Sequence, residues 1–141
     1  MKSLKSYIRD VPNFPKEGVH FKDITTLLQS PEGVAQCLEL LLSQLKTMKV
    51  DKVVAVEARG FFFGMLLAKA LKVPFVPVRK PGKLPRKVVV QSYDLEYGSD
   101  KLEMHEDSIQ KGDKVLIHDD VLATGGTAEA VCKMIESTGG E

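Results

Sequence analysis

Two adjacent aspartates, Asp119 and Asp120, stand just before a loop of small and hydroxyl residues: Ala123, Thr124, Gly125, Gly126 and Thr127. The glycines let successive backbone N–H groups point one way, and the threonine hydroxyls add donors, which is typical of a phosphate site at the start of a helix. Carboxylates beside such a loop repel a bare phosphate. They suit a ligand that also carries a diol, or a Mg²⁺ ion whose waters they order. A ribose 5-phosphate has this combination.

Other phosphate motifs are missing from this loop, and the alternative is an ordinary strand-to-helix connection with acidic turn residues. No lysine follows the glycines, as it does in ATP-binding loops, and there is no G-x-G-x-x-G dinucleotide fingerprint. Two acids next to Thr-Gly-Gly-Thr favour the sugar-phosphate interpretation.

Two further groups of residues are suited to a second anion. One is a turn after another expected strand, formed by Glu57, Ala58, Arg59 and Gly60. Its guanidinium and backbone N–H groups are good anion donors, although a surface arginine at a tight turn is the alternative. The other is a run of basic side chains shaped by two prolines and a glycine, comprising Arg79, Lys80, Lys83, Arg86 and Lys87. It is an anion clamp or a solvated basic loop; without interleaved aromatic residues, a nucleic-acid surface is disfavoured.

Composition and charge limit the class of protein. The 141 residues fit a single domain, 43% are hydrophobic, and a net charge of +1 gives no overall field for nucleic acid. The N-terminus lacks the apolar core of a signal peptide, and the most apolar window, 61–71, is too short to span a membrane. We expect a soluble, cytoplasmic protein with no membrane partner, in which Cys37 and Cys132 are buried thiols and form no disulfide.

The elements that position these residues follow from hydrophobic periodicity. Short buried strands are expected at 52–56, 73–78 and 114–118, and helices from Pro31, after Gly60, and over 127–138. The alternation predicts an open parallel α/β sheet flanked by helices, whose ligands bind at the carboxyl ends of the strands. Residues 2–10 suggest a short helix and 11–23 an irregular loop. Alternating residues around Gly98 predict a hairpin.

The motifs resemble those of a known family. "VLIHDDVLATGGT" is similar to the phosphoribosyl-diphosphate (PRPP) signature of the type I phosphoribosyltransferases. "NFPKEGVHFKDIT", "EARGFFFG", and "VRKPGKLP" with "SYDLEYG" resemble the adenine phosphoribosyltransferases in particular. The resemblance covers nearly the whole chain. It implies a parallel α/β fold with a hairpin lid and an N-terminal hood. It also implies a purine-salvage reaction that transfers the phosphoribosyl group of PRPP to adenine and yields AMP and pyrophosphate. The implied cofactor is Mg²⁺, and the implied assembly is a homodimer.

The resemblance also assigns roles to individual residues. It places the PRPP ribose and phosphate at Asp119, Asp120 and the loop Ala123, Thr124, Gly125, Gly126 and Thr127. It places the pyrophosphate at Glu57, Ala58, Arg59, Arg79, Lys80 and Lys83, and adenine at Phe14, His20, Lys22 and Val121. Glu96 and Arg59 are the implied catalytic residues. Mg²⁺ is held mainly by the substrate, through water to Asp119 and Asp120, and no metal site of the protein's own is implied.

The choice of base rests on two small residues. Relatives acting on hypoxanthine and guanine carry an aspartate where this chain has Ala123 and a lysine where it has Gly126, so adenine is the expected base. A transferase for xanthine or for hypoxanthine and guanine is the enzymatic alternative. A PRPP-binding regulator without turnover is the other, although no segment is left over for a helix-turn-helix.

The resemblance further divides the chain into a base-binding segment at 1–30 and a flexible lid at 79–110, which we expect to lie outside the core. Relatives continue past the last helix with strands that this chain lacks. We therefore expect Val131, Met134 and Ile135 to be incompletely buried, and the isolated chain to be unstable or to aggregate, with little activity.

Overall fold

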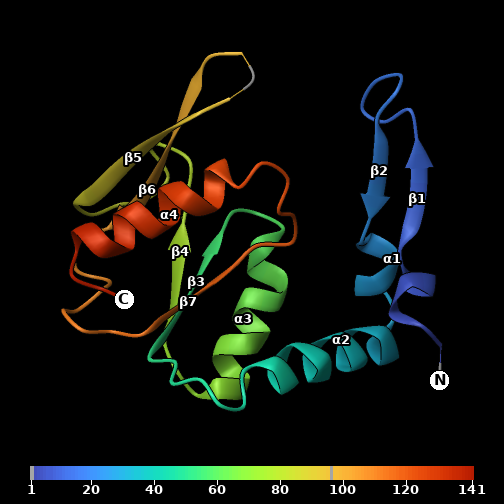
Figure 1. The fold of residues 1–141 in the computed structure, drawn as a ribbon, viewed down its shortest axis with the longest axis horizontal. Helices are drawn as coiled ribbons and strands as arrows, with labels where there is room; N and C mark the ends of the chain where they lie inside the picture. The colour runs from blue at the N-terminus through green and yellow to red at the C-terminus, as the bar shows by residue number, and fades with distance from the viewer. Residues whose placement is uncertain (1, 96) are drawn as a thin grey trace. The chain divides into compact units, whose positions relative to one another are not determined.

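The computed structural model describes residues 2–95 and 97–141, and the chain divides into two compact units, 1–47 and 48–141 (Figure 1). That the whole chain is one domain stays a prediction. Among the described residues, no helix is both long enough and apolar enough to cross a membrane. Both cysteines are free, but Cys37 is only half-buried and Cys132 is exposed, so the expectation of buried thiols was wrong.

The first unit contains a hairpin that the sequence did not predict. Its elements are the 3₁₀ helix η1 (Leu4–Tyr7), strands β1 (Arg9–Pro12) and β2 (His20–Asp23), and helices α1 (Thr25–Leu28) and α2 (Pro31–Gln44). The expected helix over 2–10 is limited to the four residues of η1, and much of the expected loop is paired antiparallel strand, with Arg9 opposite Asp23 and Pro12 opposite His20. A proline at the end of a strand removes no interior hydrogen bond, which explains why Pro12 is tolerated there.

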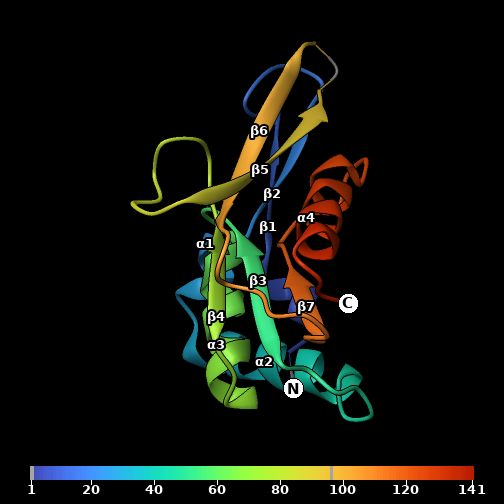
Figure 2. The ribbon, with the colours of Figure 1, turned by 90° about the vertical axis from the view of Figure 1, so that its left-hand side faces the viewer.

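The second unit has the predicted parallel sheet. Its strands are β4 (Phe75–Val78), β3 (Lys52–Val56) and β7 (Val115–His118), in that order across the sheet. Helix α3 (Gly60–Leu71) follows β3, helix α4 (Gly126–Ser137) follows β7, and the predicted hairpin is formed by β5 (Val88–Asp94) and β6 (Ser99–His105) (Figure 2). The expected fold class is confirmed.

The side chains of β3 lie alternately on the two faces of this sheet, because successive residues of a strand point in opposite directions. On one face, Ala55 lies so close to α3 that a β-carbon on Gly64 would stand 2.7 Å from the Ala55 side chain, so the helix can approach only at a glycine. On the other face, Val54 and Val56 join the core cluster that contains the buried side of α4.

Helix α4 is completely covered on its apolar side, contrary to expectation. Val131, Met134 and Ile135 are 0%, 1% and 3% exposed. Part of their cover comes from Leu102 and Met104 of β6, which are both fully buried in the same cluster. The base of the hairpin therefore belongs to the core, and the expectation that the whole hairpin lies outside it was wrong.

Candidate active site

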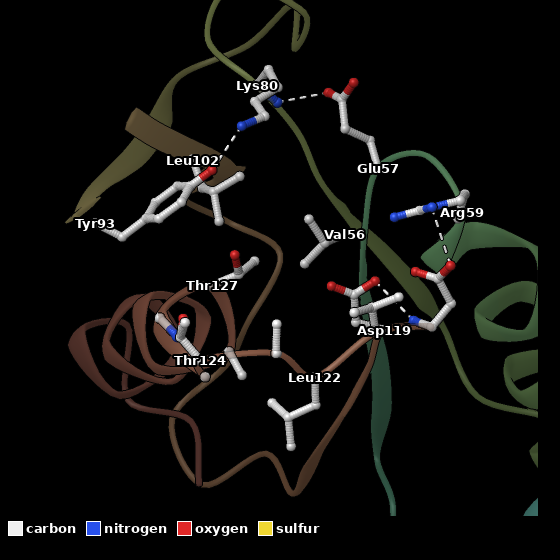
Figure 3. A pocket seen from close by; sticks show the side chains of 16 residues that line it. Val56, Glu57, Arg59, Lys80, Tyr93, Leu102, Asp119, Leu122, Thr124 and Thr127 are labelled. Carbon is white, nitrogen blue, oxygen red and sulfur yellow. Dashed lines mark hydrogen bonds and ion pairs between the residues drawn. The ribbon is translucent and has the colours of Figure 1, made fainter. Parts of the chain in front are cut away.

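A cavity of about 260 Å³ opens at the carboxyl ends of the strands (Figure 3). Its walls come from the end of β3, from the hairpin and from the loop between β7 and α4. The lining residues are Val56, Glu57, Arg59, Lys80, Tyr93, Leu102, Asp119, Asp120, Val121, Leu122, Ala123, Thr124, Gly125, Gly126, Thr127 and Ala128. Parallel sheets bind ligands at this edge, so the predicted sugar-phosphate loop and the predicted second anion turn meet at one site.

The loop from β7 to α4 is built to present hydrogen-bond donors. Gly125 has a φ of 86°, a left-handed conformation that side chains rarely adopt, and α4 begins at the next residue. The Thr124 hydroxyl accepts a hydrogen bond from the Gly126 N–H at 3.3 Å and so stabilises the turn. Thr124 and Thr127 both line the cavity at the positive end of the helix, where an anion is favoured.

The two aspartates differ in their surroundings. The Asp120 carboxylate is only 10% exposed, and its Oδ2 lies 3.1 Å from Nε of Arg59 (Figure 3). Asp119 accepts the backbone N–H of Asp120 at 2.8 Å. Partial burial of its carboxyl, together with the neighbouring Asp120 side chain, raises the pKa of Asp119 to about 6. Near neutrality, Asp119 is therefore an acceptor whose charge a hydroxyl or a cation would stabilise.

Glu57 organises the basic residues that follow β4. Its peptide bond to Ala58 is cis, and its side chain is 10% exposed. One carboxylate oxygen accepts the backbone N–H of Lys80 at 2.6 Å, and the other accepts the Lys83 ammonium at 2.5 Å. Burial opposes ionisation of Glu57, but these hydrogen bonds and the charges of Lys83 and Arg79 outweigh it, so the pKa of Glu57 lies below its usual value.

Lys80 directs its side chain towards the hairpin. Its ammonium donates to the Tyr93 hydroxyl at 2.7 Å (Figure 3) and also to the Asp100 carboxylate. Burial opposes the charged form, but these two partners outweigh it and raise the pKa of Lys80 above its usual value. Lys80 therefore connects the segment after β4 to the hairpin.

The candidate residues fall into three groups. The first group lines the cavity and contains all the residues assigned to the PRPP ribose and phosphate, together with Val121, Glu57, Arg59 and Lys80. Ala58, Arg79 and Lys83 are not among the lining residues, although both cations pair with Glu57. Phe14, His20 and Lys22 belong to the first unit, where Lys22 pairs with Asp10 and the Phe14 ring packs edge-on against Phe21. Glu96 lies outside the described residues. The roles of all these residues stay predictions.

Sequence reasoning missed several cavity residues. Val56, Tyr93, Leu102, Leu122 and Ala128 line the cavity and were not candidates. Leu122 lies within the quoted PRPP signature and Ala128 directly follows it, so both could have been included with that motif. The only signal for Tyr93 was the alternation of apolar and polar residues in the hairpin. Its contact with Lys80 joins two segments that lie 13 residues apart, and no local pattern indicates such a contact.

No group of three or more His, Cys, Asp or Glu within residues 2–95 and 97–141 could hold a metal ion. The adjacent carboxylates of Asp119 and Asp120 in the cavity wall nevertheless fit a Mg²⁺ ion that keeps its waters and is carried by phosphate oxygens, because this ion sheds water reluctantly.

Comparison with known proteins assigns the family. The phosphoribosyl transferase domain profile matches residues 23–141, and an adenine phosphoribosyltransferase from Flavobacterium johnsoniae is 62% identical over 138 residues, or 98% of this chain and 81% of that relative. The chain belongs to the adenine phosphoribosyltransferase family. The structure of an adenine phosphoribosyltransferase from Thermoanaerobacter pseudethanolicus aligns with a TM-score of 0.94 at 50% identity, covering 97% of this chain and 80% of that chain. The structure of the enzyme from Saccharomyces cerevisiae also aligns with a TM-score of 0.94, at 39% identity, covering 98% of this chain and 81% of that chain. The yeast structure is a complex with an imino-altritol bisphosphate and adenine.

Family membership agrees with the resemblance found in the sequence. The PRPP signature quoted from the sequence supplies most of the cavity wall, after β7, and the adenine phosphoribosyltransferase motifs add Glu57, Arg59, Lys80 and Tyr93. The cavity is therefore the candidate active site of a pentosyl-transferring enzyme, and its Asp119–Thr127 loop is the candidate phosphoribosyl site.

Proposed function

We propose that the chain transfers the 5-phosphoribosyl group from PRPP to adenine, giving AMP and pyrophosphate in purine salvage. One observation carries the proposal most directly: paired carboxylates and a helix-terminal phosphate loop share a single cavity with an arginine-bearing turn at the next strand end. PRPP needs two anion sites separated by a diol, and this cavity offers both with acceptors between them.

In the proposed reaction, a bond forms between the adenine ring nitrogen and the anomeric carbon of the ribose as the bond from that carbon to pyrophosphate breaks. Asp119 and Asp120 accept hydrogen bonds from the ribose hydroxyls, and the loop at 123–127 holds the 5-phosphate. Positive charge on the sugar and negative charge on pyrophosphate develop together, so placed acceptors and donors favour the transition state. Arg59 and the turn at 57–60 receive the leaving pyrophosphate.

Mg²⁺ is the proposed cofactor and, when bound, neutralises the charge of the leaving pyrophosphate. Asp119 and Asp120 are the residues that would hold it, through its water molecules. Glu96 is proposed to take the proton of the base, and Phe14, His20, Lys22 and Val121 to bind adenine.

The proposed function is tested by measuring pyrophosphate release from PRPP and Mg²⁺ with adenine as the acceptor. We expect release that depends on both substrates, with AMP formed in equal amount. Binding of PRPP without AMP formation would instead support the regulator alternative.

The activity is expected to fall in acid. Because the pKa of Asp119 is raised to about 6, its carboxylate gains a proton as the pH drops through that value and loses acceptor capacity for the ribose diol. We expect kcat/KM for PRPP to decrease by up to about tenfold per pH unit below 6. Asp119→Asn carries no such group, so its profile should lack this step; identical profiles for the two proteins would contradict the assignment.

The tip of the hairpin is proposed to close over the reaction. Tyr97 is 87% exposed, and exposed substitutions change stability little. We expect Tyr97→Ala to lower kcat by up to about tenfold, the scale of one aromatic contact, with the melting temperature unchanged. Val90→Ala, half-exposed on the same hairpin, is the matched control and should keep full turnover. A loss of melting temperature with normal turnover in Tyr97→Ala would make the tip structural.

We further propose a cytoplasmic homodimer. The free thiols of Cys37 and Cys132 support a reducing compartment. Phe62 and Met65, one turn apart on α3, are 46% and 53% exposed and offer apolar surface for a second copy. Light scattering on the purified chain measures the assembly, and a monomer at micromolar concentration would contradict it.

A further inference from the structure

The basic segment, residues 79–83, is held in place by two glutamates. Glu103 of β6 pairs with Arg79 through both backbone hydrogen bonds, at 2.9 and 2.8 Å, and its side chain accepts the Gly82 N–H at 2.8 Å. Glu57 accepts the Lys80 N–H at 2.6 Å and the Lys83 ammonium at 2.5 Å. Of these two glutamates, Glu57 alone lies at the cavity wall, in the turn proposed to receive the leaving pyrophosphate.

Glu57 cannot serve pyrophosphate by direct contact. Its side chain is mostly buried and ionised, and two negative charges repel at short range. Its surroundings are cationic: besides Lys83, the Arg79 guanidinium places Nε 3.4 Å from a Glu57 oxygen. Within residues 2–95 and 97–141, that Nε is buried and has no hydrogen-bond partner, so its link to Glu57 is the attraction of opposite charges.

The side chains of Arg79 and Lys83 retain N–H donors that can bind a second anion. An ammonium has three N–H donors and a guanidinium five, so Lys83 and Arg79 can each contact Glu57 and still donate elsewhere. With Glu57 in place, the Arg79 guanidinium and the Lys83 ammonium both lie at its carboxylate, in the turn at 57–60. Without its charge, they repel one another and the flexible Lys83 side chain is free to leave.

We propose that Glu57 is a positioning residue for pyrophosphate. It fixes the basic segment beside the turn at 57–60 and gathers the charges of Arg79 and Lys83, without touching the anion itself. The inference rests on the proposed function, since it assigns the leaving group of that reaction to this side of the cavity.

The test measures pyrophosphate binding directly, so it does not depend on turnover. Inorganic pyrophosphate with Mg²⁺ is titrated by calorimetry into the full chain, into Glu57→Gln, and into Glu106→Gln as the matched control. Glu57→Gln keeps the volume and an acceptor for the Lys80 N–H but loses the charge. Glu106 is another glutamate paired with a lysine, Lys87, at a solvent-exposed position outside the cavity lining.

We expect Glu57→Gln to bind pyrophosphate about 10- to 100-fold more weakly than the unsubstituted chain, the scale of a lost charge-assisted contact, and Glu106→Gln to bind it equally well. In the enzymatic assay, KM for PRPP should rise while KM for adenine stays within about twofold, a split that general loss of structure would not produce. Equal or tighter pyrophosphate binding by Glu57→Gln would overturn the inference, because Glu57 would then be a competitor of the anion.

Two further results keep the outcomes separate. If Glu57→Gln does not fold, Glu57→Asp takes its place: its shorter side chain cannot span the Lys80 N–H and Lys83, so weaker binding is expected and unchanged affinity overturns the inference. If the chain forms no AMP from adenine yet Glu57→Gln still weakens pyrophosphate binding, the proposed reaction fails while the role of Glu57 stands.

Discussion

Replacing either aspartate of the cavity by asparagine is expected to lower kcat/KM for PRPP by about 30- to 1000-fold, or roughly 2–4 kcal/mol of transition-state stabilisation. The amide keeps the shape of the carboxylate but loses its charge, at the point where positive charge develops on the ribose. The loss should appear in kcat as well as in kcat/KM, because the interaction strengthens in the transition state.

The same substitutions should leave the fold intact. The raised pKa of Asp119 means that its ionised form is disfavoured in the folded chain. The unsubstituted chain therefore loses folding stability as the pH rises through about 6 and this carboxyl ionises, whereas Asp119→Asn has no such group and avoids that loss. Asp120→Asn breaks the ion pair with Arg59, whose side chain is 48% exposed, so the cost is at most about 1 kcal/mol.

Thermal melting of both variants at neutral pH checks this separation of activity from stability. Asp107→Asn, which removes a carboxylate paired with Arg86 at an exposed position, is the matched control and should keep full activity. If both cavity variants turned over PRPP at nearly the normal rate, Asp119 and Asp120 would have no part in holding the diol.

Selection of the base is the second large effect. We expect kcat/KM for adenine to exceed that for hypoxanthine or guanine by about 1000-fold or more, because a site that matches one pattern of donors and acceptors leaves buried groups unpaired with the other. Ala123 lines the cavity and offers no carboxylate to a 6-oxopurine.

Gly126 bears on the same choice. A β-carbon there would meet only the Thr124 hydroxyl at 3.5 Å and the Asp94 carbonyl at 3.8 Å, which are ordinary contacts. Space therefore does not require a glycine at 126, in contrast to Gly125 with its positive φ. The combined variant Ala123→Asp, Gly126→Lys should narrow the preference for adenine over hypoxanthine and guanine. Ala35→Asp, at an exposed position of α2 outside the cavity lining, is the control. Hypoxanthine used as well as adenine by the unsubstituted chain would refute the expected specificity.

The parts of the molecule encoded by local patterns were predictable. The strand Lys52–Val56 and the helix after Gly60 follow from an apolar run and a glycine turn, and the loop at 123–127 follows from its glycines and hydroxyls. Because parallel strands end at one edge, the meeting of the 57–60 turn with Asp119 and Asp120 could also be predicted.

Features set by long-range pairing could not be predicted. The β1–β2 hairpin was missed because Pro12 and Pro15 interrupt the alternation that indicates a strand. The direction of the Lys80 side chain depends on Tyr93 and Asp100, which lie 13 and 20 residues further along the chain. The burial of Val131, Met134 and Ile135 depends on Leu102 and Met104, and no pattern within α4 reports that cover.

The burial of Leu102 and Met104 has a mechanical consequence for the hairpin. Both side chains are locked into the core under α4, whereas Tyr97 near the tip is almost fully exposed. The two ends of one pair of strands thus differ in how far they can move. Any closing motion over the cavity must pivot between Leu102 and the tip, near the level where Tyr93 lies opposite Asp100. In such a motion, the contact of Lys80 with Tyr93 and Asp100 would lie at the pivot and would set the angle of the tip, while α4 behind the loop at 123–127 stayed in place.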